Sequence, residues 1–275
     1  MFIEDLRALQ STGVTSNLIS TLRMIEINPI EMCNRKCNFC PRSTDFYKNK
    51  KFSISKDTVK KISSDLESFN FNGRIGFVGF GEPLLHPELE ELINIVKKEV
   101  TNLKWLEINT NGDFLTLERM KSIKDSGCTT IAISMYDIDK SQYFNEMAEL
   151  ANMNIILRHH YNSSNNYGLR IVNRNDIIDE TSNFETDKTH CYIPFYKMLI
   201  DWNGDVLLCD NDWSKKNKFG NVHNMSINDI WINSELNNYR NYLSNGNRIL
   251  DPCKKCNACG TLFGYESFIK FQETK

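Results

Sequence analysis

The sequence lacks any apolar run near the ~20 residues that a membrane-spanning helix needs. Its formal net charge is only −2 over 275 residues, so no overall field favours nucleic acid or an anionic membrane. The first ten residues include Glu4 and Asp5 and do not resemble a secretory signal. There is no internal repeat and no low-complexity block. We therefore expect a cytoplasmic protein that binds neither membrane nor nucleic acid.

Cysteine, in contrast, is abundant. The chain has nine cysteines, and 40% of its residues are apolar, which is compatible with a packed core. A reducing cytosol makes structural disulfides improbable, so metal binding or catalysis becomes the leading explanation. An odd count also leaves at least one cysteine outside any fully paired scheme.

Strand and helix patterns alternate through the first half of the chain. Predicted strands cover 23–28, 74–78, 104–109, 130–134 and 154–157, and predicted helices cover 55–69, 87–100, 115–126 and 140–151. Ser55 is a plausible N-cap for the first of these helices. Alternating strands and helices predict an α/β fold built around a parallel sheet.

The alternation breaks after Arg158, where residues 161–188 are polar and show no period. A hairpin is then predicted from the apolar runs Met198–Asp201 and Val206–Cys209, which flank an Asn203-Gly204 turn. Residues 226–243 look like one helix. We place a domain boundary near Asn183, which gives residues 1–182 and residues 183–275.

The sharpest motif places Cys33, Cys37 and Cys40 at a C-x3-C-x2-C spacing. A short loop can wrap three thiolates around one face of an iron–sulfur cubane. The loop offers no fourth cysteine, so one iron would stay open to a small molecule. A zinc site is the alternative, although zinc knuckles favour paired C-x2-C units.

This loop, directly after a first strand, resembles the radical SAM superfamily. The resemblance implies a partial (β/α)6 barrel and a [4Fe–4S] cluster whose open iron binds S-adenosylmethionine (SAM). It also implies cleavage of SAM to a 5′-deoxyadenosyl radical that abstracts hydrogen from a substrate. Phe39 would pack against the adenine of SAM, and an external donor such as flavodoxin or ferredoxin would supply the electron.

Further motifs follow the later strands, where barrel folds build their sites. Gly79-Phe80-Gly81-Glu82-Pro83 resembles the family's Gly-Gly-Glu segment, in which Glu82 would accept the SAM amino group. Each motif alone is more often an ordinary turn. We expect the cofactor-binding residues to be Phe39, Gly79, Gly81, Glu82, Asn109, Asn111, Ser134 and Arg158. The sixth barrel strand is hard to place, and Leu169–Val172 is our candidate.

A second cysteine set follows the barrel, with Cys191 and Cys209 flanking the hairpin and Cys253 and Cys256 in a C-x2-C pair. These four can hold a second cluster, and by spacing alone they can equally hold zinc. The arrangement resembles the auxiliary-cluster regions called SPASM and twitch, in the shorter twitch form that holds one [4Fe–4S] cluster. Cys128 is expected in the core.

The resemblance extends to members that oxidise or epimerise aminocyclitols and aminoglycosides. It implies a small carbohydrate substrate, namely a sugar, nucleotide sugar or aminocyclitol, for which Arg174 is our first candidate contact. Oxidation would pass an electron to the auxiliary cluster, whereas epimerisation would use a thiol hydrogen donor, for which Cys259 is the candidate catalytic residue. The alternative is a peptide- or protein-modifying enzyme. A non-catalytic zinc or electron-transfer protein fails to explain the ordered strand-end motifs.

Overall fold

The computed structural model describes residues 18–136, 139–160, 172–174, 177–178, 191–258 and 264–274. Its centre is an eight-stranded sheet with the strand order β5-β4-β3-β2-β1-β6-β7-β8. The strands are β1 (Met24–Ile27), β2 (Arg74–Phe77), β3 (Trp105–Thr110), β4 (Thr130–Met135), β5 (Asn154–His159), β6 (Lys197–Ile200), β7 (Asp205–Leu207) and β8 (Lys218–Asn221). Along this order, each pair of neighbouring strands from β5 through β1 to β6 is parallel. Strand β7 pairs antiparallel with both of its neighbours, β6 and β8.

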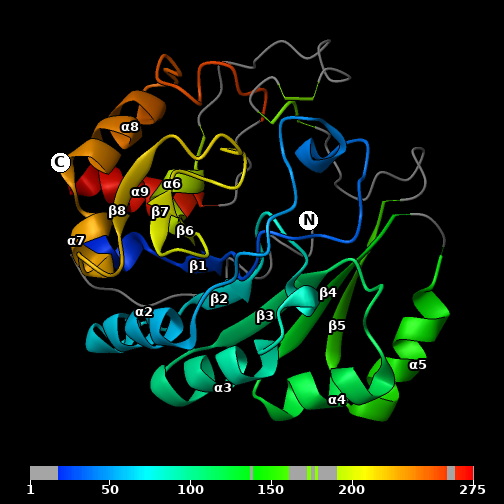
Figure 1. Ribbon diagram of the computed structural model, residues 1–275. Helices are drawn as coiled ribbons and strands as arrows, with labels where there is room; N and C mark the ends of the chain where they lie inside the picture. The colour runs from blue at the N-terminus through cyan, green and yellow to red at the C-terminus, as the bar shows by residue number, and fades with distance from the viewer. Residues whose placement is uncertain are drawn as a thin grey trace.

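Four helices follow the first four strands in turn. They are α2 (Lys56–Ser68), α3 (Leu89–Glu99), α4 (Leu117–Asp125) and α5 (Ser141–Ala151). Figure 1 shows them together on one side of the curved sheet. Every residue of strands β1, β2 and β4 is buried, as expected for strands that are covered on both faces of the sheet. The predicted parallel α/β fold is confirmed.

Helix α2 illustrates how local sequence forms these units. The Ser55 hydroxyl accepts a hydrogen bond from the backbone N–H of Thr58, as the predicted N-cap requires. Val59, Ile62 and Leu66 recur at helical spacing and are fully buried, so they form the face that packs on the sheet. The same helix also packs against α3.

The C-terminal region continues the barrel sheet. Strand β6 pairs in parallel with β1, and the β6–β7 hairpin turns at Gly204, as predicted. The proposed boundary at 182/183 lies outside the described residues and stays a prediction. Within the candidate sixth strand, Leu169–Val172, only Val172 belongs to the described residues, and it is not in a strand. The sixth parallel strand among the described residues is β6, which pairs with β1 on the side away from β2.

The single helix expected over 226–243 is wrong. The structure has two helices, α7 (Ile227–Trp231) and α8 (Ser234–Ser244). Asn233 has an extended backbone, and its side chain accepts a hydrogen bond from the N–H of Leu236, so it caps a new helix. The sequence analysis also missed β8, α6 (Ile193–Tyr196) and α9 (Tyr265–Glu273).

Helices α6, α8 and α9 meet in a small second core. It is built from Phe195, Leu243, Phe268 and Phe271, and Cys191 and Cys253 pack against its edge. The core therefore supports two cysteines of the second set. Among the described helices, none has both the length and the apolar composition that crossing a bilayer requires.

Candidate active site between two cysteine loops

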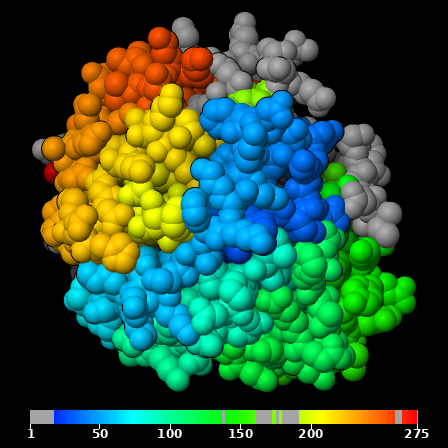
Figure 2. All heavy atoms as spheres, in the orientation of Figure 1, coloured from blue at the N-terminus to red at the C-terminus, as the bar shows by residue number. Residues whose placement is uncertain are grey.

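The first cysteine loop leaves the C-terminal end of β1. Cys33, Cys37 and Cys40 are partly exposed, and the N–H of Cys40 donates to the carbonyl of Cys37 at 2.9 Å. The N–H of Arg35 donates to Cys33 Sγ at 3.4 Å. Figure 2 shows this part of the chain, in blue, on the visible face between the yellow hairpin and the cyan and green helices. The loop thus presents its thiols at the strand ends, as predicted.

The segment after β2 packs against the residues that lead into this loop. The N–H of Glu82 donates to the carbonyl of Met32 at 2.8 Å. A Cβ on Gly81 would lie 2.0 Å from the carbonyl oxygen of Ile30, and one on Gly79 would lie 2.6 Å from the Asn28 side chain. Both glycines therefore allow the two segments to approach closely, which is a packing reason for the motif in addition to any SAM contact.

We expect Gly81→Ala to destabilise the protein and displace the first cysteine loop. The added methyl meets backbone rather than a movable side chain, and overpacking of this kind costs about 1–3 kcal/mol. Urea unfolding should show a lower midpoint, and reconstituted protein should retain less iron. Gly76→Ala is the matched control, because its Cβ would meet Val78 Cγ1 at an ordinary 3.4 Å. Equal behaviour of the two variants would contradict this account.

Glu82 is buried and already holds three protein donors. Its Oε1 accepts from Leu84 N at 3.0 Å and Thr110 Oγ1 at 2.6 Å, and its Oε2 accepts from Asn111 N at 2.9 Å. Burial raises the pKa of this carboxyl above its usual range. A carboxylate offers about four acceptor positions, so one position remains on Oε2 for a further donor such as an ammonium.

The loop after β3 clamps the first cysteine loop from the side. Arg35 forms a two-pronged ion pair with Asp113, with both N···O distances at 2.6 Å. Asn34 Nδ2 donates to Asp113 Oδ2 at 2.6 Å, and Asn111 Nδ2 donates to Asn34 Oδ1 at 2.9 Å. The Arg35 hydrogen bonds hold the pKa of Asp113 below its usual range. The sequence analysis missed Asp113, because its partner lies 78 residues away.

Aromatic rings gather where β4 and β5 end. The Phe39 and Tyr136 rings lie 5.2 Å apart, and Tyr136 stacks on His160 at 5.3 Å. The Ser134 side chain hydrogen-bonds to the Tyr136 phenol, whose pKa burial raises to about 12, and the charge of Arg158 also acts on it. Three predicted cofactor residues, Phe39, Ser134 and Arg158, therefore converge on Tyr136, which the sequence analysis did not identify.

Asn109 provides one test of whether a ligand fits here. It lies on β3, and its buried Oδ1 has no hydrogen-bond partner among the described residues. A buried acceptor without a donor costs free energy, so a ligand that donates to it would be stabilised. The strand ends thus offer a free acceptor, a carboxylate with a spare position and an aromatic group, a set that suits the polar and adenine parts of SAM.

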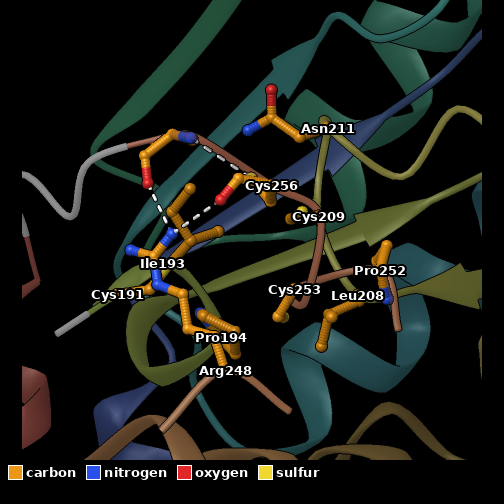
Figure 3. Close-up of a pocket in the computed structure, with 11 residues that line it drawn as sticks. Cys191, Ile193, Pro194, Leu208, Cys209, Asn211, Arg248, Pro252, Cys253 and Cys256 are labelled. Atoms are coloured by element: carbon orange, nitrogen blue, oxygen red, sulfur yellow. Dashed lines mark hydrogen bonds between the residues drawn. The ribbon is translucent and has the colours of Figure 1, made fainter. Parts of the chain in front are cut away.

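The second cysteine set surrounds one cavity, shown in Figure 3. Cys191 precedes α6, Cys209 follows β7, and Cys253 and Cys256 lie in the loop after α8. The remaining lining is mostly apolar: Ile193, Pro194, Leu208, Pro252 and Ala258, with Asn211 and Arg248. Burial raises the pKa of all four thiols. The predicted ligand set is therefore brought together from three separate segments.

The chemistry of this donor set suits an iron–sulfur cluster. A [4Fe–4S] cluster takes one thiolate per iron, and the cavity lining presents four cysteines. A structural zinc site can use the same four ligands, so the metal content of the protein distinguishes the two centres.

An apolar layer packs against the first cysteine loop at Cys40. It consists of Phe80, Leu199, Leu207 and Trp213, with Cys40, Tyr47 and Ile177 packed against it. A buried polar network lies below: Lys215 binds Glu31 and Asp201, and Asn28 donates to the same two carboxylates at 3.1 and 2.7 Å. Glu31 belongs to the first loop and Asp201 to the hairpin, so this network fixes one relative to the other.

Arg174 lies between the two cysteine sets. Its Nη1 donates to Asn211 Oδ1 at 2.5 Å, and its charge opposes the burial that raises the pKa of Cys40 and Cys256. Asn173 anchors it, since its backbone N–H donates to Asn257 Oδ1 at 2.7 Å and its side chain donates to the carbonyl of Lys255 at 2.7 Å. The candidate donor Cys259 lies outside the described residues. Cys128 is buried in the core, as predicted.

Comparison with known proteins agrees with this geometry. The model of the radical SAM superfamily matches residues 27–154, and that of the SPASM iron–sulfur cluster-binding domain matches residues 191–259. The S-adenosyl-L-methionine-dependent 2-deoxy-scyllo-inosamine dehydrogenase of Niallia circulans is 28% identical over 85% of this chain and 92% of its own length.

Solved structures and a second relative extend the comparison. The crystal structure of BtrN in complex with AdoMet and 2-DOIA has a TM-score of 0.75 and 28% identity, covering 86% of this chain and 93% of that one. The GTP 3′,8-cyclase of Aquifex aeolicus is 32% identical over 43% of this chain but only 36% of its own length, so the likeness is confined to one part. Taken with the loop after β1 and the four-thiol cavity, these matches mean that the chain carries a radical SAM superfamily domain over residues 27–154 and a C-terminal SPASM iron–sulfur cluster-binding domain over residues 191–259.

Proposed function

We propose that this enzyme oxidises a hydroxyl group of an aminocyclitol, or of a closely related hydroxylated small molecule, to a carbonyl. Its cofactors are SAM and [4Fe–4S] clusters, as its two domains imply. The observation that supports the proposal is that one chain presents two separate thiol sets, three in the first loop and four around the second cavity, with Arg174 hydrogen-bonded to Asn211 of the cavity lining. The near full-length similarity to an aminocyclitol dehydrogenase supports the substrate class.

The first cysteine loop would hold the SAM-binding cluster through Cys33, Cys37 and Cys40, and the cavity thiols of Cys191, Cys209, Cys253 and Cys256 would hold the second. Bound there, the cofactors supply a 5′-deoxyadenosyl radical that removes the carbinol hydrogen, and an acceptor for the electron left when the hydroxyl proton departs. The set proposed to contact SAM is Phe39, Gly79, Gly81, Glu82, Asn109, Asn111, Ser134 and Arg158.

The chain's own side chains would hold the substrate between these sites. Arg174 and Asn211 offer donors and an acceptor to hydroxyl groups, which is the chemistry that positions a polyol. The apolar layer around Phe80 and Trp213 limits access of water to the same region. An exclusion of water protects a radical from side reactions.

Two alternatives share the cofactors. Epimerisation would need a thiol hydrogen donor, and Cys259 is the candidate. Peptide modification is the other: the native anSMEcpe structure with bound AdoMet has a TM-score of 0.57 at 14% identity, which shows a shared fold alone. The dehydrogenase similarity favours oxidation over both. The first electron would come from flavodoxin or ferredoxin, and the proposed location of the enzyme is the cytoplasm.

A substrate panel tests the proposal. Anaerobic enzyme, SAM and dithionite would be incubated with aminocyclitols, nucleotide sugars and short peptides, and products followed by liquid chromatography and mass spectrometry. We expect a ketone, two mass units lighter than its substrate, only with the aminocyclitols. Turnover of peptides alone would reject the proposal.

We expect Arg174→Gln to lower kcat/KM for the aminocyclitol about 10- to 100-fold, because a hydrogen bond to a charged group contributes about 1.5–3 kcal/mol. The Kd for SAM should be unchanged. Lys216→Gln is the control, since it removes an exposed charge from the β7–β8 connection, which also carries the Arg174 partner Asn211. Wild-type kcat/KM in Arg174→Gln would show that this arginine does not contact the substrate.

A further inference from the structure

Arg248 is the one charged residue among the described residues that line the four-thiol cavity. It follows α8 in the chain and precedes Cys253 by five residues, and its side chain is half-buried. Figure 3 shows that side chain extending along the cavity wall toward the loop that carries Cys256. The cysteine spacing alone did not predict a role for this arginine.

The guanidinium closes the turn that presents Cys256. Arg248 Nη1 donates to the carbonyl of Cys256 at 3.3 Å and to that of Ala258 at 2.7 Å. Within the turn, the N–H of Ala258 donates to Cys256 Sγ at 3.3 Å. The residue between them, Asn257, is held from the other side by Asn173. Arg248 therefore fixes the position of the Cys256 sulfur and the hydrogen bond that this sulfur accepts from the N–H of Ala258.

The same guanidinium also places a positive charge beside the other sulfurs. Arg248 lines the same cavity as Cys191, Cys209, Cys253 and Cys256, and its Nη1 lies 3.3 Å from the carbonyl oxygen of Cys256. In an apolar lining such a charge is weakly screened, so its effect on a neighbouring anion is large.

We propose that Arg248 is a positioning residue that sets the electron affinity of the auxiliary cluster, through its charge. A four-thiolate cluster becomes more negative by one charge when it takes up one electron, and net charge and hydrogen bonds to sulfur are two determinants of cluster potential. Arg248 thereby favours the reduced form. This inference rests on the proposed auxiliary cluster, and it concerns acceptance of the substrate's electron rather than binding of the substrate.

The test measures the midpoint potential of the auxiliary cluster in the full-length chain. The three cysteines of the first loop would be replaced by alanine, so that one cluster remains, and reduction would be followed by electron paramagnetic resonance. We expect Arg248→Gln to lower the electron affinity at least tenfold, which is about 59 mV for one electron. Arg248→Lys, which keeps the charge, should stay within threefold of the unsubstituted chain.

Lys254→Gln is the matched control, because it removes an exposed charge from the same loop and should leave the potential unchanged. An unshifted potential in Arg248→Gln would overturn the inference, as would an equal shift in Arg248→Lys. If Arg248→Gln retains no iron, Arg248→Lys alone tests the inference. A tenfold loss of electron affinity in Arg248→Lys would then contradict the role of charge. Absence of iron from the chain with an intact Arg248 would instead refute the auxiliary cluster itself.

Discussion

Cys37→Ala should reduce the release of 5′-deoxyadenosine from SAM to the buffer background. Three thiolates are the fewest that hold a cubane with one open iron, and Cys37 is the middle one of the loop. Release under dithionite would be followed by chromatography after anaerobic reconstitution.

The control for this variant is Cys128→Ala. Cys128 is a buried thiol that donates to the carbonyls of Leu106 and Thr130 at 3.4 and 3.2 Å, and it precedes β4, whereas the first cysteine loop follows the C-terminal end of the parallel strand β1. It should keep wild-type iron content and SAM cleavage, apart from a modest loss of stability. Wild-type release of deoxyadenosine by Cys37→Ala would overturn the assignment of the first loop.

Cys253→Ala should separate SAM cleavage from product formation. Cys253 lines the second cavity and packs against the core around Phe195, away from the strand ends where SAM is proposed to bind. We therefore expect about four irons to be lost of about eight, because each cluster of this type holds four. Deoxyadenosine release should continue, while ketone formation falls to background.

Iron and sulfide analysis accompanies that experiment. Wild-type protein with about four irons would remove the auxiliary cluster, and stoichiometric zinc would restore the zinc alternative for the second site. Normal ketone formation by Cys253→Ala, with four irons remaining, would show that the second cluster is not the electron acceptor.

Features that depend on local sequence were predictable. The five strands before Arg158 and the four helices between them appear close to their expected bounds, since each depends on periodicity and on caps such as Ser55. The Asn203-Gly204 hairpin also formed as expected, because a positive φ at Gly204 is a local requirement. The break at Asn233 was missed because asparagine within a helical pattern does not by itself announce a second N-cap.

Features that depend on contacts between distant segments were not predictable. Asp113 pairs with Arg35 across 78 residues, and Tyr136 has a role only because β4 ends beside Phe39. The parallel pairing of β6 with β1 joins residues about 173 positions apart, and no period in the sequence encodes it. The cysteine motifs identified the chemistry, whereas the fold identified the residues that support it.

The transfer of a labelled hydrogen tests the central claim most directly. Anaerobic enzyme, SAM and dithionite would be given 2-deoxy-scyllo-inosamine, the substrate named for the similar dehydrogenase, with deuterium on its carbinol carbons. We predict 5′-deoxyadenosine that carries one deuterium, together with an equal amount of ketone. Unlabelled deoxyadenosine with no ketone would contradict the account, and in deuterated water an inverted alcohol that gains solvent deuterium would replace oxidation by epimerisation.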